Sequence, residues 1–160
     1  MRLVAPVVVT LTTLVAGGCA SYEGSTLSSQ LASWNRATGF WSQVGTVVGD
    51  ASRVSAVEAG GVAADLRTDC IVLSNDTRGA YQLLPTPDPG LTAGLDQALK
   101  LEQTAAGDCY GAAAGGAPAL TRADAERARA GVALGAGCEL YQRLVGASPT
   151  APCWRAGGPG

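Results

Sequence analysis

Hydrophobic residues recur at steps of three, four and seven positions along most of the chain. Such steps place them on one face of an α-helix. The first stripe predicts a helix over about residues 26–58, with Ser25 or Thr26 as its N-cap. Glycines weaken a helix, and Gly45 and Gly49 lie within this one. If the helix is broken, the break is expected near residues 45–50. The stripe consists of Leu27, Leu31, Trp34, Trp41, Val44, Val48, Val54 and Val57.

Three further stripes predict three more helices. The proline-rich segment 85–89 must end the first of them, because proline has no N–H and restricts the residue before it. Asp88 is a suitable N-cap for the following helix, with Pro89 as its first residue. Thr121 is expected to cap the last helix. The predicted helices cover about residues 61–84, 89–113 and 122–146.

Four helices joined by short loops predict an all-α fold, an up-down-up-down four-helix bundle. The chain is rich in Ala and holds 22 Gly, which favours a close approach of the helices. Aromatic residues make up only 5% of the sequence, so the core is expected to be thin. The bundle is expected to occupy residues 26–146, followed by an irregular Pro- and Gly-rich tail over 147–160.

The first residues have a different character. Arg2 is followed by a short apolar run over 3–15, and three small residues then precede Cys19. This order is typical of a secretory signal peptide, here residues 1–18. The run is shorter than the roughly 20 residues that a membrane-spanning helix needs. Residues 19–25 would then form a short spacer before the bundle.

The segment Val15-Ala16-Gly17-Gly18-Cys19 resembles the lipobox of bacterial lipoproteins, although Ala16 stands where Leu or Val is usual. The resemblance implies that Cys19 receives a diacylglycerol carrying fatty acids such as palmitate, and that cleavage occurs before it. It also implies a lipid-anchored protein on the extracytoplasmic side of the cell membrane. The alternative is an ordinary secreted protein in which Cys19 is incidental.

Five cysteines are an odd number for an exported chain, and assigning Cys19 to the lipid leaves four. Four thiols in an oxidising compartment predict two disulfides. The favoured pairing is Cys70–Cys109 with Cys138–Cys153, because it costs least geometrically. The alternative is Cys109–Cys138 with Cys70–Cys153. Without His or closely spaced Cys, no metal site is expected.

The mature part also resembles small helical bacterial lipoproteins. The resemblance covers a Cys-bearing helix, a Pro-Asp-Pro turn and a second Cys-bearing helix, here Cys70, Pro87-Asp88-Pro89 and Cys109. It implies no particular activity.

Trp34, Phe40 and Trp41 hold most of the large aromatic area and are candidate contact residues. They could line a ligand groove or dip into lipid headgroups beside the anchor. Core packing is the favoured interpretation for Trp34 and Trp41, which lie seven apart on one stripe. Phe40 lies off that stripe and is the better candidate for a contact.

Acidic residues offer two further candidates. Asp65, Asp69 and Asp76 could together bind calcium, but a solvated acidic helix face is the favoured interpretation. Glu102 lies on a hydrophobic stripe and could be a buried acid, although a position at the bundle edge is expected. Surface ion pairs are predicted at helical spacing for Asp96–Lys100, Arg122–Glu126 and Glu139–Arg143.

The absence of His removes Ser-His-Asp triads, Cys-His dyads and His pH switches, and no phosphate-binding loop occurs. No catalytic residue and no cofactor are therefore predicted. The net charge of −2 provides no basic surface for nucleic acid. We expect a lipid-anchored binding or structural module without catalysis, partnered by the membrane and by another envelope protein. The alternative is a carrier or sensor of a small apolar ligand held in the bundle core.

Overall fold

The computed structural model describes residues 25–60, 63–113, 117–148 and 152–154. The lipobox-like segment, Cys19 and the signal-peptide prediction lie outside these residues. The described residues form five helices and contain no strand. The helices are α1 (Leu27–Thr38), α2 (Phe40–Gly60), α3 (Ala63–Tyr81), α4 (Pro89–Ala112) and α5 (Ala117–Val145).

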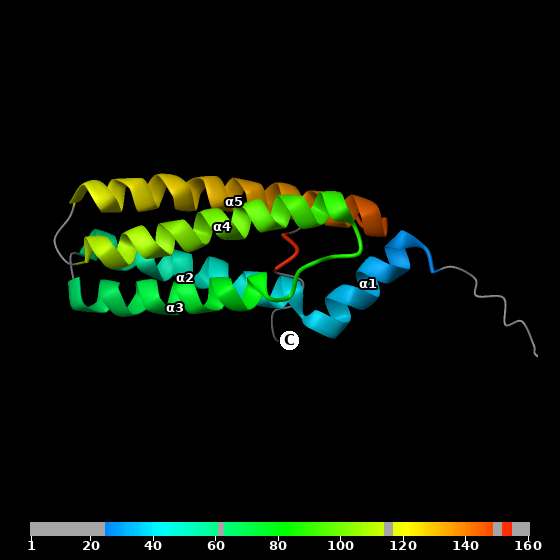
Figure 1. The fold of residues 1–160 in the computed structure, drawn as a ribbon, viewed down its shortest axis with the longest axis horizontal. Helices are drawn as coiled ribbons and strands as arrows, with labels where there is room; N and C mark the ends of the chain where they lie inside the picture. The colour runs from blue at the N-terminus through cyan, green and yellow to red at the C-terminus, as the bar shows by residue number, and fades with distance from the viewer. Residues whose placement is uncertain (1–24, 61–62, 114–116, 149–151, 155–160) are drawn as a thin grey trace, which may run out of the picture.

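The helices form a bundle, so the all-α prediction is confirmed. In Figure 1, α2, α3, α4 and α5 lie side by side, and α1 tilts away at one end. The contacts between α4 and α5 are the most extensive, and α3 packs against both α2 and α4. Helix α1 contacts α5 and α2. The count of four helices was wrong, because the first predicted helix is two.

The break between these two helices is at Gly39, not near residues 45–50. Gly39 has a φ of 65°, the left-handed conformation that glycine adopts without steric cost. Its N–H donates to the Asn35 carbonyl at 2.8 Å and closes the end of α1. Gly45 stays within α2, where the missing side chain makes room for Trp154, whose Cβ would be 3.3 Å from an added Cβ.

The predicted helix starts were right in two cases and wrong in one. The Thr26 hydroxyl accepts from the Ser29 N–H at the start of α1. Asp88 accepts from the Leu91 N–H at 2.6 Å and Pro89 is the first residue of α4, as predicted. Thr121 is not a cap, because α5 already begins at Ala117. A proline at position 118 is compatible with a first helical turn, where an N–H has no intrahelical partner.

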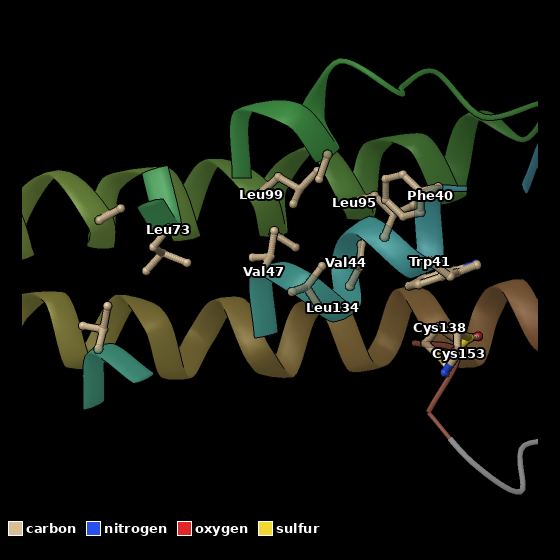
Figure 2. Close-up of a cluster of buried hydrophobic side chains, with 14 of the residues drawn as sticks. Phe40, Trp41, Val44, Val47, Leu73, Leu95, Leu99, Leu134, Cys138 and Cys153 are labelled. Atoms are coloured by element: carbon tan, nitrogen blue, oxygen red, sulfur yellow. Dashed lines mark hydrogen bonds between the residues drawn. A yellow bond between two sulfur atoms is a disulfide. The ribbon is translucent and has the colours of Figure 1, made fainter. Parts of the chain in front are cut away.

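The core consists mainly of aliphatic side chains of α2, α3, α4 and α5, and it also includes Leu31 of α1 and the aromatic residues Phe40 and Trp41. Figure 2 shows Val44 and Val47 of α2 between Leu95 and Leu99 of α4 and Leu134 of α5. Gly137 of α5 faces Leu95, and a Cβ at this glycine would come within 2.8 Å of Leu95 Cδ2. The small residue therefore allows α5 to approach α4 closely.

Two disulfides join parts of the chain that are distant in sequence. Cys70 of α3 is bonded to Cys109 of α4, with 5.9 Å between the Cα atoms. Cys138 of α5 is bonded to Cys153 in the C-terminal segment, with 5.6 Å between the Cα atoms. The favoured pairing is confirmed and the alternative pairing is wrong.

None of the helices in the described part of the chain combines the length and the apolar character that crossing a bilayer requires.

Candidate functional site

A pocket of about 320 Å³ opens between α2, α4 and α5. Its apolar wall is made by aliphatic side chains, among them Val47, Val48 and Leu134. Its polar wall is made by carboxylate, guanidinium and hydroxyl groups. The polar lining residues are Ser52, Ser55, Glu102, Asp124 and Arg127.

Glu102 of α4 is the most unusual residue of this pocket. The residue is only 2% exposed, and its Oε1 has no hydrogen-bond partner among the described residues. Burial raises the pKa of its carboxyl to about 7, although the nearby Arg127 guanidinium opposes the shift. A buried carboxyl without a partner costs free energy unless a ligand or water satisfies it.

The expectation that Glu102 lies at the bundle edge was wrong. Its position on the helical stripe of Leu95 and Leu99 already pointed inward, and the structure follows that spacing. The apolar residues on this helix face therefore indicated the burial of Glu102 better than its charge did.

Arg127 of α5 is the second buried charge, 8% exposed. Its Nη2 and Nη1 donate to Glu58 of α2 at 3.0 and 3.1 Å. Nη1 also donates to the Ser55 hydroxyl at 2.8 Å and lies 3.2 Å from Asp124. This bidentate geometry suits a guanidinium, and it ties α5 to α2 beside the pocket. Arg127, Glu58 and Ser55 were not predicted as site residues, because no local spacing in the sequence links α2 to α5.

The pocket combines groups that can recognise a ligand. Arg127 is committed to two carboxylates, which neutralise its charge. The Glu102 carboxylate can accept a hydrogen bond or form an ion pair with a cation. Together with the apolar wall, these groups can bind a ligand through ion pairs, hydrogen bonds and buried apolar surface.

The three candidate aromatic residues belong to a packed cluster. Phe40 is fully buried, so its prediction as the better contact residue was wrong. It starts α2 directly after the Gly39 bend, which turns its ring toward Trp34 and Trp41 at centroid distances of 5.0 and 5.2 Å. Trp41 is 3% exposed, and Trp34 is half-buried with its Nε1 donating to the Leu83 carbonyl at 3.3 Å. The core interpretation of both tryptophans agrees with these positions.

The acidic residues of α3 do not converge. Within the described residues, no group of three or more Cys, Asp or Glu is placed to hold a metal ion. Asp65 is exposed, whereas Asp76 is half-buried beside Asp50 of α2. Asp50 is 2% exposed, and burial together with the Asp76 carboxyl raises its pKa to about 6. No spacing in the sequence predicts the Asp50–Asp76 pair, because its members lie on different helices.

Two of the three predicted surface ion pairs form. Lys100 Nζ lies 2.8 Å from Asp96, and Arg143 lies 3.9 Å from Glu139. The Arg122–Glu126 prediction was wrong, since Arg122 instead pairs with Asp108 of α4. The close packing of α4 on α5 brings this carboxylate within reach.

Comparison with protein-family models, with curated proteins and with solved structures finds no match to this chain.

Proposed function

We propose that this chain is a lipid-anchored binding protein of the bacterial cell envelope that holds a small molecule in the pocket between α2, α4 and α5. The observation that carries the proposal is the Glu102 side chain, which lines the pocket at 2% exposure with an unpartnered oxygen. A buried polar group of this kind commonly marks a site where a partner is missing.

The shape of the pocket supports a small-molecule ligand. Its volume of about 320 Å³ falls at the lower end of the range for ligand sites, roughly 300–1,000 Å³. The walls are partly apolar and partly polar, so the ligand is amphipathic rather than purely apolar. This departs from the carrier of an apolar ligand considered from the sequence.

The bundle supplies the rigid frame of the proposed site. In this proposal α2 to α5 act as an up-down four-helix unit, and α1 is an addition at one end. Catalysis is not part of the proposed function, because the pocket offers recognition groups only.

The membrane location of the proposal comes from the lipobox-like sequence ending at Cys19. Replacing Cys19 by Ala in the full chain, expressed in a bacterium, removes the proposed acceptor of the lipid. We expect the wild type in the membrane fraction and the variant outside it. Retention of the Cys19→Ala variant in the membrane fraction would contradict the anchor.

The ligand site is tested by filling the pocket. Gly131 lines it, and a Cβ at Gly131 meets nothing within 4 Å, so Gly131→Leu can occupy pocket space without a backbone clash. Gly107→Leu is the matched control, because Gly107 is equally open on α4 but does not line the pocket.

A fragment screen by saturation-transfer NMR on the full-length chain provides the measurement. Fragments that bind the wild type are expected to bind Gly107→Leu and to lose binding to Gly131→Leu. A screen without binders, or with binders that ignore Gly131→Leu, overturns the proposed ligand site.

A further inference from the structure

We propose that the pocket recognises a small organic cation, with an ammonium group on the Glu102 carboxylate and an apolar body against Val47, Val48 and Leu134. This inference rests on the proposed binding function and names the chemical class of the ligand. It follows from the charge balance of the pocket, from the depth of Glu102 and from the character of the remaining walls.

The charge balance leaves Glu102 without a counter-ion of its own. Arg127 is the cation of the pocket lining, and it is engaged by Glu58 through both terminal nitrogens and by Asp124. Two carboxylates therefore already oppose one guanidinium. An ionised Glu102 adds a further negative charge, so the cluster favours a positive ligand over an anion.

Asp124 and Glu102 both line the pocket but differ in their exposure to solvent. The Asp124 side chain is 58% exposed and lies in water-accessible surroundings, whereas Glu102 is 2% exposed. A charged group held at Glu102 is therefore screened little by salt. An ammonium group there would donate a hydrogen bond to the unpartnered Oε1 and supply the missing charge.

The apolar wall of the pocket favours a ligand with an apolar body attached to its ammonium group. Val47, Val48, Ala51 and Leu134 present aliphatic surface beside the carboxyl group. A ligand with a short apolar body would bury this surface, whereas a fully polar polyamine would not. The best fit is a primary amine with a compact hydrocarbon or aromatic body.

The same arrangement couples binding to pH. The charged groups that line the pocket with Glu102 are Arg127 and Asp124 of α5, and Glu58 of α2 pairs with Arg127. Because the Glu102 pKa is about 7, a cation competes with a proton for the carboxylate. Binding is therefore expected to weaken about tenfold from pH 8 to pH 6.

The test uses isothermal titration calorimetry on the full-length chain with matched probes. Benzylamine carries the ammonium group, benzyl alcohol is its neutral counterpart, and benzoate is its anionic counterpart. We expect benzylamine to bind at pH 8 at least tenfold more tightly than either counterpart. Glu102→Gln should lose at least tenfold in benzylamine affinity, whereas the exposed control Glu139→Gln should lose none.

The outcomes separate this inference from the proposed function. Equal binding of benzyl alcohol or benzoate, or full affinity in Glu102→Gln, overturns the cation assignment. Absence of benzylamine binding up to about 10 mM also overturns it. In either case, fragments that bind the wild type but not Gly131→Leu would still support the pocket as a ligand site. The ligand would then belong to a different chemical class. If no fragment binds, the proposed function fails together with the inference.

Discussion

Arg127 of α5 and Glu58 of α2 form a bidentate ion pair across the bundle, with nitrogen–oxygen distances of 3.0 and 3.1 Å. Their side chains are only 8% and 11% exposed, so the pair is largely shielded from water. Such a pair is costly to break from one side, because the remaining charge stays buried.

Arg127→Met is therefore expected to lower the free energy of unfolding by about 3–5 kcal/mol. Urea unfolding followed by circular dichroism measures this loss. The control is Arg143→Met, because Arg143 is 63% exposed in a similar helical pair and should cost at most about 1 kcal/mol. Equal losses in the two variants would show that the buried pair has no special role.

Glu102→Gln is expected to raise stability at alkaline pH. The folded chain holds a proton on Glu102 up to a pKa of about 7, whereas the unfolded chain releases it near 4.5. Between these values the folded state binds more protons, so stability falls as the pH rises, and above pH 7 the full cost of about 3 kcal/mol is present. The variant lacks this cost and should melt higher than the wild type at pH 8 but not at pH 4.

Thermal melts at both pH values, together with those of the exposed control Glu139→Gln, measure the difference. A gain at pH 8 that persists unchanged at pH 4 would contradict a titrating buried carboxyl.

Gly137→Ala is expected to be less stable than Gly107→Ala by roughly 1–3 kcal/mol. An alanine Cβ at position 137 would come within 2.8 Å of the fully buried Leu95, whereas position 107 is open. At the open site the change should stabilise α4 by up to about 1 kcal/mol through helix propensity. Denaturant midpoints of the two variants provide the comparison, and equal midpoints would show that α4 and α5 are not in close contact at Gly137.

Removal of each disulfide is expected to destabilise the chain by an amount that depends on its loop. The Cys138–Cys153 bridge spans 15 positions, and its replacement by two serines should cost about 3 kcal/mol. The Cys70–Cys109 bridge spans 39 positions, and the corresponding loss should be about 4 kcal/mol. Non-reducing peptide mapping of the wild type provides the direct check, and a Cys109–Cys138 fragment would contradict the observed pairing.

Much of the helical fold follows from local signals in the sequence. The Pro-rich turn and the Asp88 cap locate the start of α4, because both act on their immediate neighbours. The cysteine pairing also follows, since antiparallel helices bring Cys70 nearer to Cys109 than to the other cysteines, and the tail that carries Cys153 begins near Cys138. The bend at Gly39 was missed because several glycines compete in one window, and only tertiary packing selects which of them adopts the left-handed conformation.

The candidate site was harder to predict, because it is made by residues of three helices. Arg127 and Glu58 lie 69 positions apart, and no periodic pattern joins them. Glu102 was identifiable from its place on an apolar stripe, but its charge favoured the bundle edge. Phe40 was predicted to face outward, because it lies off the hydrophobic stripe of one continuous helix. The bend at Gly39 divides that helix, and Phe40 is buried at the start of α2.

The two disulfides described above join α3 to α4, and α5 to the C-terminal segment, so neither includes α2. Helix α2 nevertheless forms a whole side of the Glu102 pocket, held there by packing and by the Arg127–Glu58 pair. Neither disulfide therefore connects two of the three pocket walls to each other, and of these walls only α2 has no disulfide at all. Among the three walls, amide hydrogen exchange should accordingly find faster cooperative opening in α2 than in α4 or α5.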